Sequence, residues 1–160
     1  GWGLYVGIVL TGIVIVAGLT VGLLVAFLCR RRNPLVRLPV IIVVDIFRAI
    51  PPLVLLIFVY SGLPFAGIQL SPFTAVCVAF FLNNSAYYGE IYRAGIESIG
   101  TGQTEAARST GLSKLQTMTF VIIPQAFLNV LPYLLSYSIE VFYLTSFSLF
   151  VSFLVLLFSS

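Results

Sequence analysis

The first hydrophobic stretch of the sequence runs from Trp2 to Cys29 and carries no charge. A helix needs about 20 residues to cross the roughly 30 Å hydrocarbon core of a bilayer, so this stretch predicts a membrane-spanning helix. The chain as a whole is 60% hydrophobic and only 8% charged, whereas soluble domains carry about 25% charged residues. A water-soluble fold cannot hide this much apolar surface. The composition therefore indicates an integral membrane protein.

Four more apolar segments predict further spans, so we expect an all-α membrane protein with a bundle of about five transmembrane helices. We treat residues 1–160 as one domain. The four segments are Leu35–Tyr60, Phe73–Ile96, Leu115–Tyr137 and Val141–Phe158. Proline removes a backbone donor and crowds the preceding turn. We therefore expect Pro51-Pro52 to break or kink the second span, and Pro124 and Pro132 to interrupt the fourth.

The basic residues predict how the chain is oriented. All eight lie on or near segments that we assign to the inside, and residues 61–72 carry none, which by the positive-inside rule places that loop outside. The N-terminus is then expected outside and residues 97–114 inside. The same rule explains the triplet Arg30-Arg31-Arg32 as an anchor, which we favour over a lipid-specific site.

The glycine pair Gly18 and Gly22 allows two interpretations. The glycines of Gly18-x-x-x-Gly22 could let a second helix approach closely, although glycine is common in membrane helices and this is the simpler explanation.

Cys29 and Cys77 are expected at different depths of the membrane, too far apart for a disulfide. Because the sequence also lacks histidine, a zinc site or a Cys-His nucleophile is excluded.

Polar residues inside the predicted spans are candidates for function. Asp45 and Arg48 are three residues apart, so a helix places them on one face as an ion pair, unless Arg48 lies at the membrane surface. Asn83, Asn84, Ser85 and Tyr87 either line a wet path or bond neighbouring helices together. A trio that follows them is more typical of a local ion-pair network than of a gate: Glu90, Arg93 and Glu97.

One long polar stretch separates the apolar segments, at residues 100–114. Thr104 is a suitable N-cap, and the next residue, Glu105, would then lie in the first turn, where the helix dipole favours an acid. Ala106 and Ala107 favour a helix, and Gly111 can end it in a left-handed conformation. The stretch predicts a short helix outside the bilayer, whose small side chains would let a partner protein approach closely.

These residues resemble a known family. Glu105-Ala106-Ala107, then Gly111, then Ile123-Pro124 are similar to the EAA loop of ABC importer permeases. The flanking sequences resemble the polar amino acid branch of that family, across roughly residues 4 to 135. They are Asp45-Ile46-Phe47-Arg48 with Pro51, Asn83-Asn84-Ser85-Ala86-Tyr87, Glu90 to Ile96, and Pro124-Gln125-Ala126.

The resemblance implies a permease subunit in the cell inner membrane that imports polar amino acids and is not itself an enzyme. It implies no cofactor on this chain, because a separate ABC ATPase subunit binds and hydrolyses ATP. That ATPase would dock on the loop that holds Glu105, Ala106, Ala107, Arg108 and Gly111. Further implied partners are a second permease copy or homologue, an extracytoplasmic amino-acid-binding protein and membrane lipid. Nucleic acid is not an expected partner.

Import of a polar amino acid requires a path for the substrate through the membrane. A zwitterionic amino acid needs a carboxylate for its ammonium group and donors for its carboxyl group. We expect Glu140 to supply the first and the amides near Asn84 the second, with bonding between helices as the competing explanation.

The C-terminal part departs from the family pattern. The family shows Lys-Asp-Thr-Ser where this chain has Tyr143-Leu144-Thr145-Ser146. The family also continues into a further span and a basic tail beyond the position of Ser160, so we expect a truncated or diverged C-terminus. These departures favour the alternative function, a degenerate permease-like membrane protein that does not transport.

Overall fold

The computed structural model describes residues 1–159, apart from the side chains of Ser152 and Leu156, and these residues contain no β-strand. The last residue of the predicted domain, Ser160, lies outside the described part. The elements in order are α1 (Trp2–Cys29), α2 (Pro34–Ala49), α3 (Pro52–Gly62), the 3₁₀ turn η1 (Leu63–Ala66), α4 (Pro72–Glu97), α5 (Thr101–Ser109), α6 (Lys114–Thr117), the π-helical turn η2 (Met118–Ile122) and α7 (Ile123–Ser159). The predicted all-α membrane class is confirmed.

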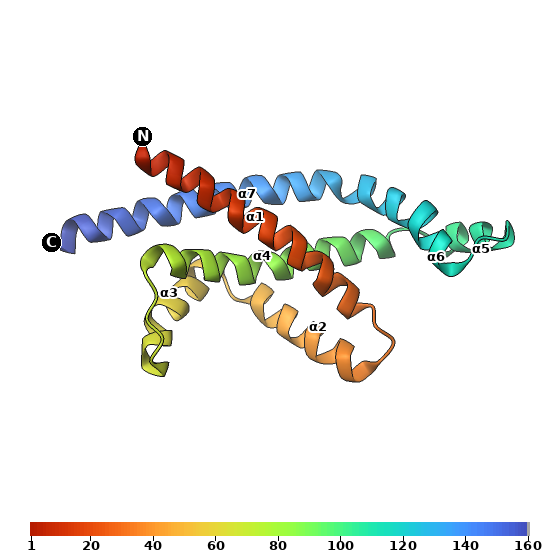
Figure 1. Cartoon of the computed structure of the whole chain (residues 1–160), viewed down its shortest axis with the longest axis horizontal. Helices are drawn as coiled ribbons and strands as arrows, with labels where there is room; N and C mark the ends of the chain where they lie inside the picture. The colour runs from red at the N-terminus through yellow and green to blue at the C-terminus, as the bar shows by residue number, and fades with distance from the viewer. Residues whose placement is uncertain (160) are drawn as a thin grey trace.

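The centre of the fold is α4, which packs against α1, α3 and α7 (Figure 1). Side chains from α1, α4 and α7 meet in a fully buried cluster of Leu10, Val14, Val76, Phe80 and Val141. A second cluster, which includes Leu55, Val59 and Ala79, joins α3 to α4. The outer faces of α1 and α7 carry many exposed apolar side chains, as expected for helices that contact lipid.

Two glycines bring α1 close to α4. A Cβ atom added to Gly22 would lie 2.7 Å from the Cβ of Tyr88 and 3.0 Å from the backbone nitrogen of Gly89. A Cβ on Gly18 would lie 3.2 Å from the Cβ of Asn84. The Gly18-x-x-x-Gly22 pattern is therefore a close-packing surface, and the simpler explanation that we preferred from the sequence is wrong.

The predicted second span is broken. The axes of α2 and α3, together with η1, are bent by 100° at Pro51-Pro52. Asn33 caps the start of α2, where its side chain accepts a 3.0 Å hydrogen bond from the Leu35 amide. The expected break is confirmed, and its size turns α3 well away from the direction of α2 (Figure 1).

The predicted fourth and fifth spans are continuous in α7, a helix of 37 residues. Pro124 lies at the start of α7, directly after the π-helical turn, and Pro132 lies inside the helix. The expectation that Pro132 interrupts the helix is wrong. Proline is tolerated inside membrane helices because neighbouring groups or local adjustments of the helix can satisfy the carbonyl that loses its donor.

By length and composition, the described residues contain two helices able to cross a membrane, Trp2–Cys29 and Lys114–Ser159. The number rises to three when the bent pair Pro34–Ala49 and Pro52–Ala66 counts as one span. The 26-residue α4 is also long enough, but its last turns carry Glu90, Arg93 and Glu97.

Candidate functional site

The polar stretch forms α5 at one end of the molecule (Figure 1). The helix begins at Thr101 with Gly100 as N-cap, so Thr104 is not the cap and Glu105 does not lie in the first turn. Gly100 has an extended backbone, with ψ of 148°, and glycine is an acceptable N-cap. The predicted start of this helix was therefore four residues too late.

The C-terminus of α5 agrees with the sequence. Gly111 has φ of +93°, the left-handed conformation that glycine adopts without steric cost. The Gly111 amide donates to the carbonyl of Arg108 over 3.1 Å, and the Leu112 amide donates to the carbonyl of Ala107 over 3.3 Å. These two bonds form a Schellman motif, which fixes where the helix ends.

The two alanines of α5 face different surroundings. Ala107 is buried, and α5 contacts both α6 and η2. Glu105, Ala106 and Arg108 are exposed. The small residue that attaches the helix to its own chain is Ala107, whereas Glu105 and Ala106 lie on the accessible surface.

The start of α7 is tied to α5 by a glutamine pair. The Gln125 side-chain amide donates to the Gln103 side-chain oxygen over 3.3 Å and to the Val121 carbonyl over 3.0 Å. Between them, Ser113 and Gln116 form a reciprocal capping box at the start of α6. The sequence analysis named Gln125 only within a family motif and did not predict its contact with Gln103, since two polar residues 22 positions apart give no signal of contact.

Asn83 and Tyr87 contact the break between α2 and α3. The Asn83 side-chain amide donates to the backbone carbonyls of Phe47 over 3.0 Å and Ile50 over 3.3 Å. The Tyr87 hydroxyl donates to the carbonyl of Arg48 over 3.0 Å. In this arrangement both side chains bond helices together, which is one of the two interpretations that the sequence left open.

Asn84 contacts α7 instead. Its side-chain oxygen accepts a 2.9 Å hydrogen bond from the Tyr137 hydroxyl, and the adjacent Ser85 bonds the Phe81 carbonyl of its own helix. Asn83 and Asn84 are each only 1% exposed. The Oδ1 atom of Asn83 and the Nδ2 atom of Asn84 have no hydrogen-bond partner in the described part of the chain.

The structure does not bring Glu140 to the asparagines. Glu140 is exposed on α7 and forms no ion pair among the described residues. The α7 residue that reaches Asn84 is Tyr137, one turn earlier. The sequence did not single out Tyr137, because nothing in the pattern shows which face of α7 meets α4.

Ion pairs link α2 to α4. Arg48 lies 3.7 Å from Asp45 and 3.7 Å from Glu90, so the expected Asp45–Arg48 pair is confirmed and extends to the next helix. Arg93 bonds Glu90 on one side and Glu97 over 2.8 Å on the other, as the expected local network. Three acids therefore surround two arginines at this end of α4. Within the described chain, no group of three His, Cys, Asp or Glu side chains could hold a metal ion.

Comparison with known proteins identifies the family to which this chain belongs. Residues 18–157 match the family described as "Binding-protein-dependent transport system inner membrane component". This match covers most of the chain, and the chain belongs to that family. The resemblance identified from residues 105–124 is confirmed.

Individual relatives agree with the family. The chain is 40% identical over 116 residues to the probable amino-acid ABC transporter permease protein YckA of Bacillus subtilis (strain 168), covering 72% of this chain and 51% of that protein. It is 38% identical over 125 residues to the putative glutamine transport system permease protein GlnP of Rickettsia typhi, covering 78% of this chain and 57% of the relative. The chain thus spans about half the length of the curated relatives it matches.

Solved structures share the fold. A crystal structure of an amino acid ABC transporter with histidines matches with a TM-score of 0.85 and 34% identity, over 91% of this chain and 68% of that one. The MetNI methionine ABC transporter in an inward-facing conformation matches with a TM-score of 0.58 and 23% identity, over 91% of this chain and 67% of that one, which supports the fold alone.

Proposed function

We propose that this chain is the permease subunit of an ATP-driven importer for polar amino acids, and that it couples to a separate ATPase subunit through α5. The observation that carries the proposal is the accessible surface of α5 on a protein of this family. Glu105 and Ala106 are exposed, while Ala107 and the Schellman motif at Gly111 hold the helix against its own chain. ATP would be bound and hydrolysed by the partner.

The helix suits a groove on another protein. Ala106 presents little side chain, so a partner can approach the backbone, and the carboxylate of Glu105 can meet a basic group. Arg108, also exposed, adds a positive charge that can meet an acidic group of the partner. The further proposed partners are a second permease copy or homologue and an extracytoplasmic amino-acid-binding protein.

Variants of α5 test the coupling. Ala106→Trp adds bulk to the proposed docking surface, and Gln69→Trp adds the same bulk to an exposed loop away from α5. We expect Glu105→Ala and Ala106→Trp to insert normally but to lose ATPase binding or substrate-stimulated ATP hydrolysis. Gln69→Trp should behave as the parent. If all three variants recruit and stimulate the ATPase normally, the proposal fails.

We also propose that the chain crosses the inner membrane several times, with its N-terminus outside. Single cysteines at Ser61 and Thr104, two exposed positions, can be placed in a variant that lacks Cys29 and Cys77. An impermeant thiol reagent should label residue 61 in intact cells and residue 104 only after lysis. The reverse pattern would invert the orientation.

The substrate path remains a proposal. Asn83, Asn84, Ser85 and Tyr87 are assigned to it together with Glu140. Its support is the pair of buried amide atoms that lack partners on Asn83 and Asn84, since unsatisfied buried polar atoms are costly and rare. We expect Asn84→Ala and Glu140→Ala to reduce uptake at equal expression. Unchanged uptake in both would place the path elsewhere.

A further inference from the structure

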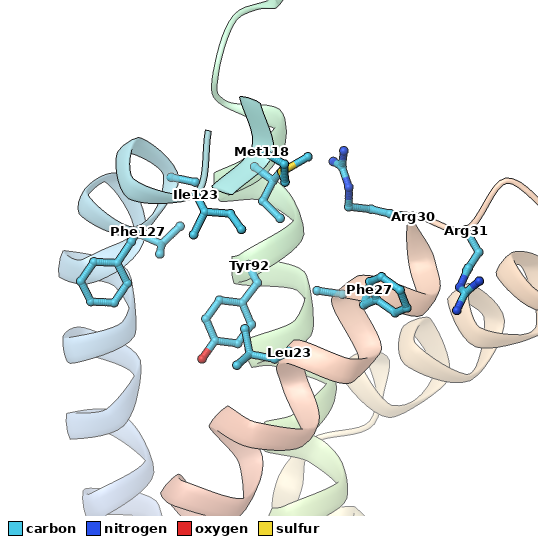
Figure 2. A pocket seen from close by; sticks show the side chains of 12 residues that line it. Leu23, Phe27, Arg30, Arg31, Tyr92, Met118, Ile123 and Phe127 are labelled. Carbon is cyan, nitrogen blue, oxygen red and sulfur yellow. The ribbon is translucent and has the colours of Figure 1, made fainter. Parts of the chain in front are cut away.

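A groove separates α1 from α4 and the start of α7 near the end of α1 (Figure 2). It encloses a cavity of about 460 Å³. Its walls are almost entirely apolar and include Leu23, Phe27, Tyr92, Met118, Ile123 and Phe127. The groove therefore has the composition of a surface that holds hydrocarbon.

Two arginines stand at the mouth of this groove. Arg30 and Arg31 line it together with the apolar side chains, and none of the described residues that line it is acidic. Neither forms an ion pair within the described chain, where the paired arginines are Arg48 and Arg93. The Arg31 guanidinium lies 4.7 Å from the centroid of the Phe27 ring, a cation–π contact that holds it beside the groove.

The depth of these arginines fits a lipid headgroup. They follow directly on α1, whose 28 residues give a helix of about 42 Å at the usual rise per residue. The hydrocarbon core is only about 30 Å thick, so the end of α1 reaches the headgroup layer. An anion at that level would meet two uncompensated guanidinium groups, while its acyl chain would lie against apolar walls.

We propose that this groove is a binding site for an anionic phospholipid. The phosphate contacts Arg30 and Arg31, and an acyl chain occupies the cavity between Leu23 and Phe127. The positive-inside rule explains the charges but not their position at the edge of an apolar cavity. A second protein copy fits poorly, because it would bury two unpaired cations at a large desolvation cost. A zwitterionic lipid would bring its own cation close to the arginines.

Native mass spectrometry of the full-length protein in detergent tests the proposal with dioleoylphosphatidylglycerol and dioleoylphosphatidylcholine. We expect a higher affinity for the anionic lipid, which falls by about fivefold for each arginine removed in Arg30→Gln and Arg31→Gln. Arg32→Gln is the matched control, since it removes the same charge from the same triplet but Arg32 does not line the groove. Lysine at both positions should retain the preference.

A second pair of variants, which leaves the charge of the groove unchanged, compares a variant that fills the cavity with a control outside it. Leu23→Trp places a larger side chain in the cavity and should weaken binding of the anionic lipid. Ile13→Trp, also on exposed α1 surface but outside the groove, should not. Equal affinity for the two lipids, an Arg32→Gln loss as large as that of the other arginines, or full displacement by inorganic phosphate would each overturn the proposal. So would dimerisation that competes with lipid.

Discussion

The hydroxyl of Tyr87 donates a 3.0 Å hydrogen bond to the backbone carbonyl of Arg48, and that carbonyl has lost its ordinary donor. In an α-helix the donor comes from four residues further on, which here is Pro52. The Asn83 side-chain amide likewise donates to the carbonyl of Phe47. The helical donor to that carbonyl would be the amide of residue 51, which is proline and has none. Two α4 side chains thus replace the two donors that the proline pair removes.

Removal of either α4 donor should destabilise the protein. An unpaired buried carbonyl costs about 1–3 kcal/mol, so we expect Tyr87→Phe and Asn83→Leu to lower the free energy of unfolding in detergent by this amount. Tyr143→Phe removes a hydroxyl from an exposed side chain and is the control. Equal stability of Tyr87→Phe and Tyr143→Phe would show that the Arg48 carbonyl finds another donor.

Two glycines near α5 should respond in opposite ways to alanine. Gly111 has a positive φ, which costs a residue with a Cβ atom about 1–2 kcal/mol. Gly102 lies within α5 without a positive φ and with open space around it, where alanine favours the helix. Amide hydrogen exchange should therefore become faster across α5 in Gly111→Ala and stay equal or slower in Gly102→Ala.

The contact of α1 with α4 predicts a further contrast. Gly22→Ala forces its new Cβ against Tyr88 and the backbone of Gly89, and overpacking of this kind costs about 1–3 kcal/mol. Gly12 lies on the same helix with nothing within 4 Å, so Gly12→Ala should be neutral. Thermal unfolding in detergent compares the two. A parent-like Gly22→Ala would contradict the close packing.

The glutamine pair gives a prediction that depends on the proposed function. Gln125→Leu removes the donor to Gln103 and to the Val121 carbonyl, each worth about 0.5–1.5 kcal/mol. We expect the ATPase still to bind α5, while stimulation of ATP hydrolysis by substrate falls several-fold. Gln69→Leu, in an exposed loop, is the control. If stimulation of ATP hydrolysis is unchanged in Gln125→Leu, the contact between Gln125 and Gln103 does not couple substrate binding to the ATPase.

The sequence predicted those features that depend on neighbouring residues. Helical membrane segments, the break at Pro51-Pro52 and the glycine that ends α5 are all local consequences of composition and backbone geometry. The prediction of where α5 starts was wrong for a reason that is also local. Gly100 and Thr104 are both acceptable caps, and only the extended backbone of Gly100 decides between them.

The polar contacts could not be predicted in the same way. Tyr137 lies 53 residues from Asn84, and the contact exists because one particular face of α7 meets α4. The long continuous α7 fixes that face, whereas the sequence suggested two separate spans with Glu140 between them. Helix rotation is set by packing over many side chains, which no short motif encodes.

The close approach of Gly18 and Gly22 to α4 also bears on movement. Parting α1 from α4 would give up contacts that depend on the absence of a side chain, and lipid tails cannot fit as closely against a bare backbone. At Pro51-Pro52 the backbone hydrogen bonds of the helix are interrupted, and α4 side chains bond the freed carbonyls instead. We therefore expect α1 and α4 to move as one rigid body during the proposed transport cycle, while the angle between α2 and α3 changes at Pro51-Pro52.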